Sequence, residues 1–358
     1  MTLQTSPQAI NQAEAGGSAV IWRTNVLAQG FSWRKRVLLR EFTAAPRVQF
    51  VDSNKSVPPN ADLLLWGSAT APAGLPAETR IVRLEDGFLR SVGLGADLVR
   101  PMSWVIDTQG IYYDAHHPSD LETLLQHGAF TAKVLARARA LRHDIVRSGL
   151  SKYNLPGTPW KRPNTSRAIV LVTGQVESDA SIVTGTVDIR TNMALLQTVR
   201  KARPQAWLVY KPHPDVEAGL RAGGEREDQA GQWADEIVAH GATAQMLPLV
   251  DEVHVMTSLT GFEALLREIP VFCYGQPFYA GWGLTRDRHT HARRTRRLVL
   301  DELVAAALLQ YPVYVSHRTR RRCSPEQALQ ELLDLRSAGN RGQLPWWRRV
   351  LRPLLARP

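Results

Sequence analysis

Short apolar runs alternate with segments of helical periodicity along most of the chain, a pattern typical of α/β layers with mostly parallel strands. In the first half, the pattern predicts strands over residues 62–66, 80–84 and 103–107. Ser119 and Glu122 have the spacing of a capping box, which predicts the start of a helix. A second helix is expected over residues 131–149.

The second half of the chain repeats this alternation after a segment rich in chain breakers. Pro156, Gly157, Pro159 and Pro163 interrupt regular structure within residues 151–167, and we place a domain boundary there. Beyond it the pattern predicts strands at 168–172, 207–210, 252–256 and 271–274, with helices about 193–201 and 261–267. The expected division is therefore 1–160, 161–315 and a C-terminal helical segment with a basic tail, 316–358. The two larger parts are compatible with two Rossmann-like units that face one cleft.

Composition and charge narrow the class of protein. The 358 residues carry 44 Lys and Arg against 33 Asp and Glu, a net charge of +11, with only two cysteines. We expect a cytoplasmic protein with neither a signal peptide nor a membrane-spanning helix. Basic runs at 286–297, 317–322 and 339–358 favour an anionic partner, which could be lipid headgroups, a phosphorylated substrate or nucleic acid; solvated basic faces are the plain alternative.

The basic tail has its own expectation. Trp346 and Trp347 precede several arginines and leucines, a composition suited to peripheral contact with anionic inner-membrane lipid. A solvated tail, or one that packs on the domains, is the alternative.

Polar residues follow several predicted strands, at the edge where open α/β sheets bind ligands. After the strand at 207–210, Lys211 and His213 could contact a phosphate, although an exposed loop histidine is equally compatible. The segment after 252–256 offers hydroxyls and a helix start that suit an anion, or an ordinary N-cap. Its candidate residues are Thr257, Ser258, Thr260, Gly261 and Glu263.

Two further loops contain carboxylates. Gln175 and Asp179 are four residues apart, close to Ser181, so an amide and a carboxylate could serve one reacting centre. The strand at 80–84 runs into Glu85 and Asp86, one of which could act as a general base, and Arg90 could pair with them. A polar surface loop and a turn with an ion pair are the respective alternatives. The sequence has no D-x-D pair, P-loop, complete G-x-G-x-x-G or H-E-x-x-H motif, so no metal and no cofactor is expected.

Seven ordered motifs give these loops a common interpretation. They are EDGFLRSVGLG (85–95), GIYYDA (110–115), SKYNL (151–155), GQVESDASI (174–182), YKPHPDV (210–216), TSLTGFEALLR (257–267) and PFYAGWGLT (277–285). Together they closely resemble the capsular polysaccharide β-Kdo transferases, over residues 22–314. The length corresponds to one module of the family, whose best-known capsule enzymes carry two.

The resemblance implies a GT-B fold, with the glycan or glycolipid acceptor held by the first domain and CMP-Kdo by the second. It implies that Kdo is transferred with retention of the β configuration, with Asp179 as nucleophile. Lys211, His213, Thr257 and Ser258 would face the CMP phosphate, and Glu85 or Asp86 would be the base for the acceptor. Independently of the resemblance, the candidates for contacts with the acceptor or with a carboxylate are Arg90, Arg190, Tyr112 and Tyr113, although aromatic residues near strand ends more often belong to the core.

Two other functions remain open at this point. Another CMP-sugar transferase, such as a sialyltransferase, would use similar acidic and His-Pro motifs. A non-catalytic basic module for anionic glycan or nucleic acid would explain the charge but not the acidic residues at strand ends, so no nucleic acid is expected as partner.

Overall fold

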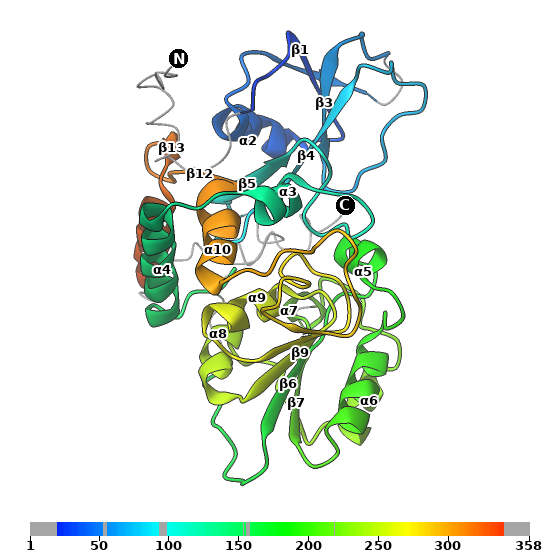
Figure 1. Cartoon of the computed structure of the whole chain (residues 1–358), viewed down its shortest axis with the longest axis vertical. Helices are drawn as coiled ribbons and strands as arrows, with labels where there is room; N and C mark the ends of the chain where they lie inside the picture. Colours follow the sequence, from blue (N-terminus) through cyan, green and yellow to red (C-terminus); the bar gives the residue numbers. More distant parts are fainter. Residues whose placement is uncertain are drawn as a thin grey trace.

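Two β-sheets with helices around them organise the chain, as Figure 1 shows. The computed structural model describes residues 20–52, 56–92, 99–152, 154, 158–217 and 219–339. The predicted α/β class is confirmed. Gly93–Gly95 and the tail from Trp346 to Pro358 lie outside the described residues.

The first sheet has seven strands in the order β13-β12-β5-β4-β3-β1-β2. The four strands β2, β1, β3 and β4 are parallel, whereas β5, β12 and β13 join by antiparallel pairing. The bounds are β1 Asn25–Gln29, β2 Val48–Val51, β3 Ala61–Trp66, β4 Arg80–Asp86, β5 Ser103–Asp107, β12 Pro312–Val315 and β13 Arg322–Cys323. Strand β4 continues two residues beyond its predicted end, so Glu85 and Asp86 belong to the strand and are paired with β5.

The second sheet is parallel throughout, in the order β11-β10-β9-β6-β7-β8. The central strand β6 is buried along its whole length, as expected for a strand covered on both faces. The bounds are β6 Ile169–Thr173, β7 Trp207–Lys211, β8 Glu236–Ile237, β9 Glu252–Val255, β10 Val271–Cys273 and β11 Arg286–Asp287. All four strands predicted in this half are present.

The helices predicted at 131–149, 193–201 and 261–267 are present within two residues of their expected bounds, whereas the helix at 33–43 and the strands β1 and β2 were not predicted. In the first half they are α2 Trp33–Thr43, α3 Asp120–His127 and α4 Ala132–Arg147. In the second half they are α5 Ala180–Gly185, α6 Asn192–Ala202, α7 Pro214–Glu217, α8 Thr243–Met246 and α9 Leu259–Leu266, with short 3₁₀ turns η2 Glu227–Gln232 and η3 Leu247–Leu249. The last helical elements are α10 Leu300–Val304, the π-helical turn η4 Ala305–Gln310 and α11 Pro325–Gly339.

After the second sheet the chain returns to the first. Helix α10 and η4 pack on α4, and β12 pairs with β5. Residues 312–315 therefore belong to the sheet of the first half, although the sequence analysis grouped them with the second. Pro312 marks the start of this strand, but a chain breaker indicates only where an element begins and not which sheet the element joins, so the pattern alone could not show the return.

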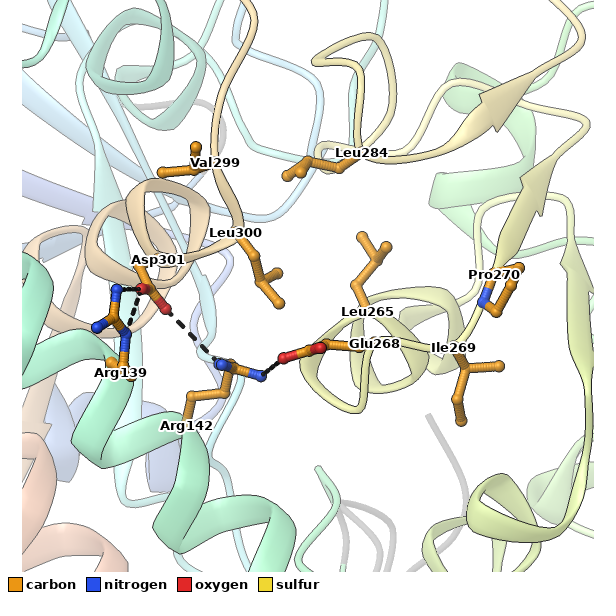
Figure 2. Close-up of a pocket in the computed structure, with 10 residues that line it drawn as sticks. All are labelled: Arg139, Arg142, Leu265, Glu268, Ile269, Pro270, Leu284, Val299, Leu300 and Asp301. Atoms are coloured by element: carbon orange, nitrogen blue, oxygen red, sulfur yellow. Dashed lines mark hydrogen bonds and ion pairs between the residues drawn. The ribbon is translucent and has the colours of Figure 1, made fainter.

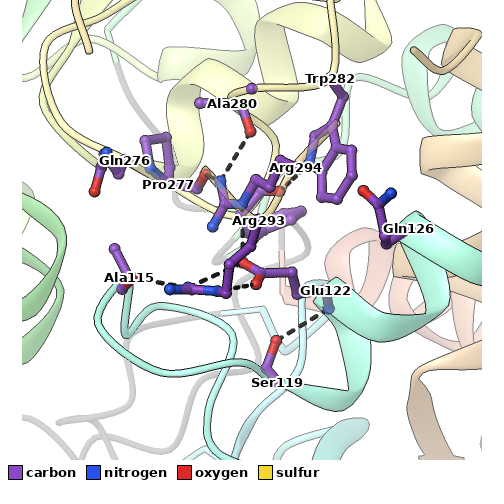
Figure 3. A network of polar contacts seen from close by, with 12 residues as sticks. Ala115, Ser119, Glu122, Gln126, Gln276, Pro277, Ala280, Trp282, Arg293 and Arg294 are labelled. Carbon is purple, nitrogen blue, oxygen red and sulfur yellow. Dashed lines mark hydrogen bonds and ion pairs between the residues drawn. The ribbon is translucent and has the colours of Figure 1, made fainter. Parts of the chain in front are cut away.

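A strap of residues 286–299 joins the two halves through buried charge (Figure 3). Glu122 on α3 accepts hydrogen bonds from Arg293 Nε (2.5 Å) and Arg294 Nε (2.9 Å). Arg294 also donates to the carbonyl oxygens of Pro277 (2.6 Å) and Ala280 (2.8 Å). The predicted capping box is therefore only half formed: Ser119 accepts from the Glu122 amide, but the Glu122 carboxylate binds the strap.

Removing the Glu122 carboxylate should destabilise this junction strongly. Burial raises the pKa of Glu122, but hydrogen bonds and charges from Arg293 and Arg294 outweigh it and lower the pKa. Glu122→Gln leaves the buried Arg294 without its charged partner, so we expect a loss of about 3 kcal/mol in the free energy of unfolding. Urea denaturation measures it.

The matched control is Asp334→Asn, which breaks the exposed pair between Arg318 and Asp334. An exposed pair contributes roughly 0.5 kcal/mol or less. Because the pKa of Glu122 is lowered in the folded protein, its stabilising contribution is present above the unfolded pKa of 4.5 and is lost as the pH falls through the folded pKa. Equal stability of the two variants at pH 7 would contradict the structural role of the strap.

Candidate active site

The candidate site lies where the carboxyl edge of the second sheet meets the first half. Helices α5, α7 and α9 follow β6, β7 and β9, and Figure 1 shows them on the side of that sheet nearest the first half. Direct hydrogen bonds connect the halves here: Thr184 Oγ1 donates to the Tyr113 carbonyl oxygen (3.2 Å) and the Ala115 amide donates to the Thr184 carbonyl oxygen (3.2 Å). This edge is the ligand-binding edge of an open α/β sheet.

Asp179 is the exposed N-cap of α5. Its Oδ2 accepts hydrogen bonds from the Ser181 amide (3.3 Å) and the Ser181 hydroxyl (2.6 Å). Both bonds go to one oxygen, so the side chain is oriented while Oδ1 has no hydrogen bond from the described residues. An oriented, accessible carboxylate is suited to nucleophilic attack as well as to capping.

His213 follows β7, and its ring is also held in one orientation. The amide of Asp215 donates to His213 Nδ1 (3.1 Å), so the neutral ring carries its proton on Nε2. Burial lowers the pKa of His213, and the carboxylates of Asp215 and Asp179 partly offset this effect. A neutral imidazole with Nε2–H can donate a hydrogen bond to a phosphate oxygen.

Glu85 has the perturbation expected of a general base near neutral pH. Burial and the charge of Asp86 raise its pKa to about 7, against the opposing effects of the Asp86 amide, Lys152 and Lys35. Gly67 lies against the Glu85 side chain. A Cβ at this position would lie 2.8 Å from Glu85 Oε2 and 2.7 Å from Tyr113 Oη. The carboxylate and the phenol therefore converge on the same point, which only glycine leaves open.

Asp86, the second candidate base, is differently placed. Its Oδ2 accepts a hydrogen bond from Arg90 Nε (2.5 Å), and the predicted ion pair is present. Arg90 is buried and also donates to the Ser91 hydroxyl (2.8 Å). Of the two adjacent carboxylates, Asp86 is thus the one that pairs with Arg90.

Electrostatic interactions connect the carboxylates of the two halves. Burial raises the pKa of Tyr113, and the charges of Glu85 and Asp179 add to the shift. The charge of Asp179 also acts on His213. The geometry agrees: the Tyr113 phenol and Glu85 both approach Gly67, and the Tyr113 carbonyl oxygen accepts from Thr184 of α5, the helix that Asp179 caps.

Two predicted donor-binding residues are engaged within the protein. Lys211 is buried, with Nζ donating to the Ala239 carbonyl oxygen (3.0 Å) and 3.7 Å from Glu217 Oε2. Gln175 uses its amide to bind Thr257, accepting from the Thr257 amide (2.9 Å) and donating to the Thr257 hydroxyl (2.9 Å). Lys211 and Gln175 each bind another loop of the second half. The sequence pattern alone does not indicate these contacts.

The start of α9 is also partly occupied by internal hydrogen bonds. Ser258 is the N-cap and accepts from the Thr260 amide (3.2 Å), as the plain alternative predicted. Gly261 packs directly on the phenol of Tyr279, where a Cβ would lie 2.2 Å from the oxygen. Glu263 is buried and accepts from the Lys152 amide (2.9 Å), and burial raises its pKa. A phosphate-binding role for this segment stays a prediction.

The remaining candidates differ in exposure. Tyr112 lies in an aromatic cluster, with ring centroids 4.9 Å from Phe88 and 5.8 Å from Phe278, so it packs between the halves. Arg190 is exposed, and its guanidinium donates only a long bond (3.4 Å) to the Val187 carbonyl oxygen among the described residues. Tyr112 thus contributes to packing, whereas Arg190 is accessible to a ligand.

The sequence analysis gave no role to two cations near the carboxylates. The Lys35 ammonium lies 3.4 Å from the Trp66 ring centroid, and its charge acts on Glu85 and Asp86. Lys152 lies where the chain crosses between the halves, and its charge acts on Glu85, His213 and Glu263. The SKYNL motif contained Lys152, but no pattern in the sequence indicated Lys35.

A cavity of about 590 Å³ lies elsewhere, beside the carboxyl end of α9 (Figure 2). Its walls combine aliphatic side chains with two ion pairs, Arg142 with Glu268 (2.7 Å) and Arg139 with Asp301 (2.7 Å). Its charged walls are mutually paired, and no candidate site residue lines it.

The residues that the structure describes contain no group of three or more His, Cys, Asp or Glu side chains placed to hold a metal ion. None of their helices has the length and apolarity needed to cross a bilayer.

Taken together, the fold and site define a two-sheet α/β protein whose chemical groups come from both halves. The chain belongs to the family described as capsule polysaccharide biosynthesis protein, which it matches over residues 62–156 and 158–317. The predicted membership in the capsular β-Kdo transferases is confirmed by relatives of known sequence and structure.

Two solved structures that resemble this chain are of Thermosulfurimonas dismutans KpsC. The β-Kdo 2,7 transferase is 38% identical with a TM-score of 0.73, and the β-Kdo 2,4 transferase is 31% identical with a TM-score of 0.76. Each match covers 87% of this chain and 99% of the solved chain.

Two relatives known from their sequences are longer than this chain. The capsule polysaccharide modification protein LipA of Neisseria meningitidis serogroup A is 41% identical over 87% of this chain and 46% of its own length. The lipopolysaccharide-processing protein LpsZ of Rhizobium meliloti is 42% identical over 82% of this chain and 68% of its own length. The chain thus spans about half the length of LipA.

Proposed function

We propose that the protein is a retaining β-Kdo transferase that uses CMP-Kdo in capsule or related cell-surface glycan biosynthesis, with a GT-B arrangement of its halves. The observation that carries the proposal is the contact between the halves at the site: α5, which Asp179 caps, is hydrogen-bonded through Thr184 to Tyr113, whose phenol lies beside Glu85 at Gly67. The solved KpsC relatives, which are β-Kdo transferases, support the sugar.

In the first half-reaction, Asp179 attacks the anomeric carbon of Kdo. The bond from that carbon to the phosphate oxygen breaks, and its electron pair leaves with CMP. His213 donates its Nε2 hydrogen bond to the leaving phosphate, where negative charge develops. The donor carboxylate repels Asp179, and Lys152 and Arg190 are the cations that we assign to reduce this repulsion. No metal or other cofactor is required by this scheme.

In the second half-reaction, Glu85 removes the proton of an acceptor hydroxyl. The hydroxyl oxygen attacks the anomeric carbon, and the bond to Asp179 breaks with return of its electron pair to the carboxylate. Two inversions give net retention. The acceptor is a glycan or glycolipid, and the reaction takes place in the cytoplasm.

The proposed role of Glu85 predicts a pH dependence. Because its pKa is raised to about 7, the fraction of ionised base, and with it the turnover rate, should rise as the pH increases from 6 to 8. Glu85→Gln should lower turnover by about 10²-fold or more and remove this dependence. Initial rates of Kdo transfer across the pH range measure both effects. Glu78→Gln, at an exposed position before β4, is the control.

Stability provides a second measurement on the same variant. A carboxyl with a raised folded pKa stabilises the fold below its unfolded value of 4.5, and this contribution is lost as the pH rises to about 7. The wild-type protein should therefore lose stability relative to Glu85→Gln across that window. Parallel stability curves would contradict the buried, proton-holding state of Glu85.

The proposed activity itself is tested by incubation with CMP-Kdo and a panel of Kdo-terminated lipid acceptors. Intact-mass analysis should show one added Kdo on the acceptor and, with the acceptor omitted, on the protein. Transfer from CMP-sialic acid in place of CMP-Kdo would overturn the proposed donor.

A further inference from the structure

Helix α2 of the first half has two unlike faces. Leu39, Phe42 and Thr43 are buried against the sheet. The exposed face carries Trp33, Arg36, Val37 and Arg40, which recur at the three- and four-residue spacing that aligns side chains along a helix. Phe50 on β2 extends this face, with the Arg36 guanidinium 4.9 Å from its ring centroid. These five residues are called the α2 face below.

The α2 face exposes large apolar side chains among cations. Trp33 is 71% and Val37 59% exposed, and Phe50 is exposed as well. Arg34 lies 5.8 Å from the centre of the Trp33 ring and adds a further positive charge at the start of the helix. The helix has one acidic residue, Glu41, which pairs with Arg100. The face is therefore aromatic, aliphatic and cationic, without a free carboxylate on the helix to oppose an anion.

We propose that the α2 face binds an anionic lipid bilayer. Tryptophan and aliphatic side chains partition into the boundary between headgroups and acyl chains, while arginines bind the lipid phosphates. A soluble glycan could stack on Trp33, but it would leave Val37 and Phe50 exposed to water. The bilayer is the partner that covers the apolar and the charged residues together.

The same helix connects this face to the acceptor side of the site. Lys35 points to Trp66, 3.4 Å from its ring centroid, and its charge acts on Glu85 and Asp86. With α2 docked on the bilayer, this helix would lie between the membrane surface and the carboxylates of Glu85 and Asp86. An acceptor anchored in the bilayer could then present its sugar to the site.

A fluorescent probe on the full chain tests this proposal without any need for turnover. Val37→Cys can be labelled selectively with a polarity-sensitive maleimide, because the two native cysteines, Cys273 and Cys323, are buried. We expect a blue shift with vesicles of 60% phosphatidylcholine and 40% phosphatidylglycerol, and none with phosphatidylcholine alone. The control is Ile237→Cys, an exposed position on β8 of the second sheet, which should show no shift.

Sedimentation with the same vesicles measures the contribution of the face. The triple variant Trp33→Ser, Val37→Ser and Arg40→Gln should lower the partition coefficient by roughly fivefold for the lost arginine and further for the lost apolar area. Lys201→Gln with Ile237→Ser removes one cation and one exposed apolar side chain from the other half and should leave it unchanged. Thermal unfolding verifies that both variants are folded.

Three results would overturn the proposal. One is undiminished vesicle binding by the triple variant, which would assign membrane contact to the tail from Trp346 to Pro358 instead. Another is a probe response to a soluble acceptor glycan but not to vesicles. The third is an equal blue shift at positions 37 and 237. Since none of these depends on Kdo transfer, they leave the proposed activity to its own test.

Discussion

Asp179→Ala should reduce Kdo transfer by about 10⁴-fold or more, because no other described group occupies the position of the proposed nucleophile. The substitution removes an exposed N-cap of a six-residue helix, so the cost in stability should be only about 1 kcal/mol. Binding of CMP should persist, since His213 and the loops of the second half stay in place. Initial rates and isothermal titration with CMP measure the two effects separately.

Asp179→Asn separates the two roles of the side chain. An asparagine retains the N-cap hydrogen bond from the Ser181 amide but cannot form the glycosyl ester as a carboxylate can. It should therefore fold with wild-type stability and remain as inactive as the alanine variant. The control is Asp188→Asn, which alters another exposed carboxylate in the same segment, paired with Arg288 and His289. Substantial turnover by Asp179→Asn would exclude the covalent intermediate.

The sequence predicted most of the elements that position the site. Strands β3, β5, β6, β7, β9 and β10 are apolar runs bounded by turn residues, and such runs have few alternatives to a buried strand. Strands β1 and β2 were not predicted, and β8, β11 and β13 were missed because each has two residues, too few for any periodic pattern. Strand β12 was missed as a partner of β5 because its pairing depends on a return of the chain, which is a tertiary property.

The candidate site was predicted as a set of loops, but not the way in which their side chains interact. Lys211 and Gln175 belong to the correct loops, yet both are engaged inside the protein. A motif shows which residue types occur together, whereas the direction of a side chain depends on neighbours distant in sequence. Glu85 and Asp86 show the same limit: adjacent in sequence, they are distinguished only by the buried Arg90, which binds one of them.

His213→Ala should lower turnover by about 10² to 10³-fold, the usual effect of removing one hydrogen-bond donor to a developing charge. Because Nδ1 accepts from the Asp215 amide, the donor in the wild-type protein is Nε2–H. His213→Gln, whose amide nitrogen can extend towards the position of Nε2, should recover part of the loss, whereas His213→Asn should not. Steady-state rates of the three variants, with the exposed His127→Gln as control, distinguish a donor from a purely structural residue.

The pH dependence of turnover distinguishes the roles of His213 and Glu85. Burial lowers the pKa of His213, so the neutral ring is the working form at pH 7, and protonation below the usual histidine range does not remove the Nε2 donor. Activity in acid should therefore be limited by Glu85, which must be ionised, and not by His213. In the His213→Gln variant the acidic limb should remain near pH 7. Loss of that limb would mean that the histidine, rather than Glu85, carries the titration of the reaction.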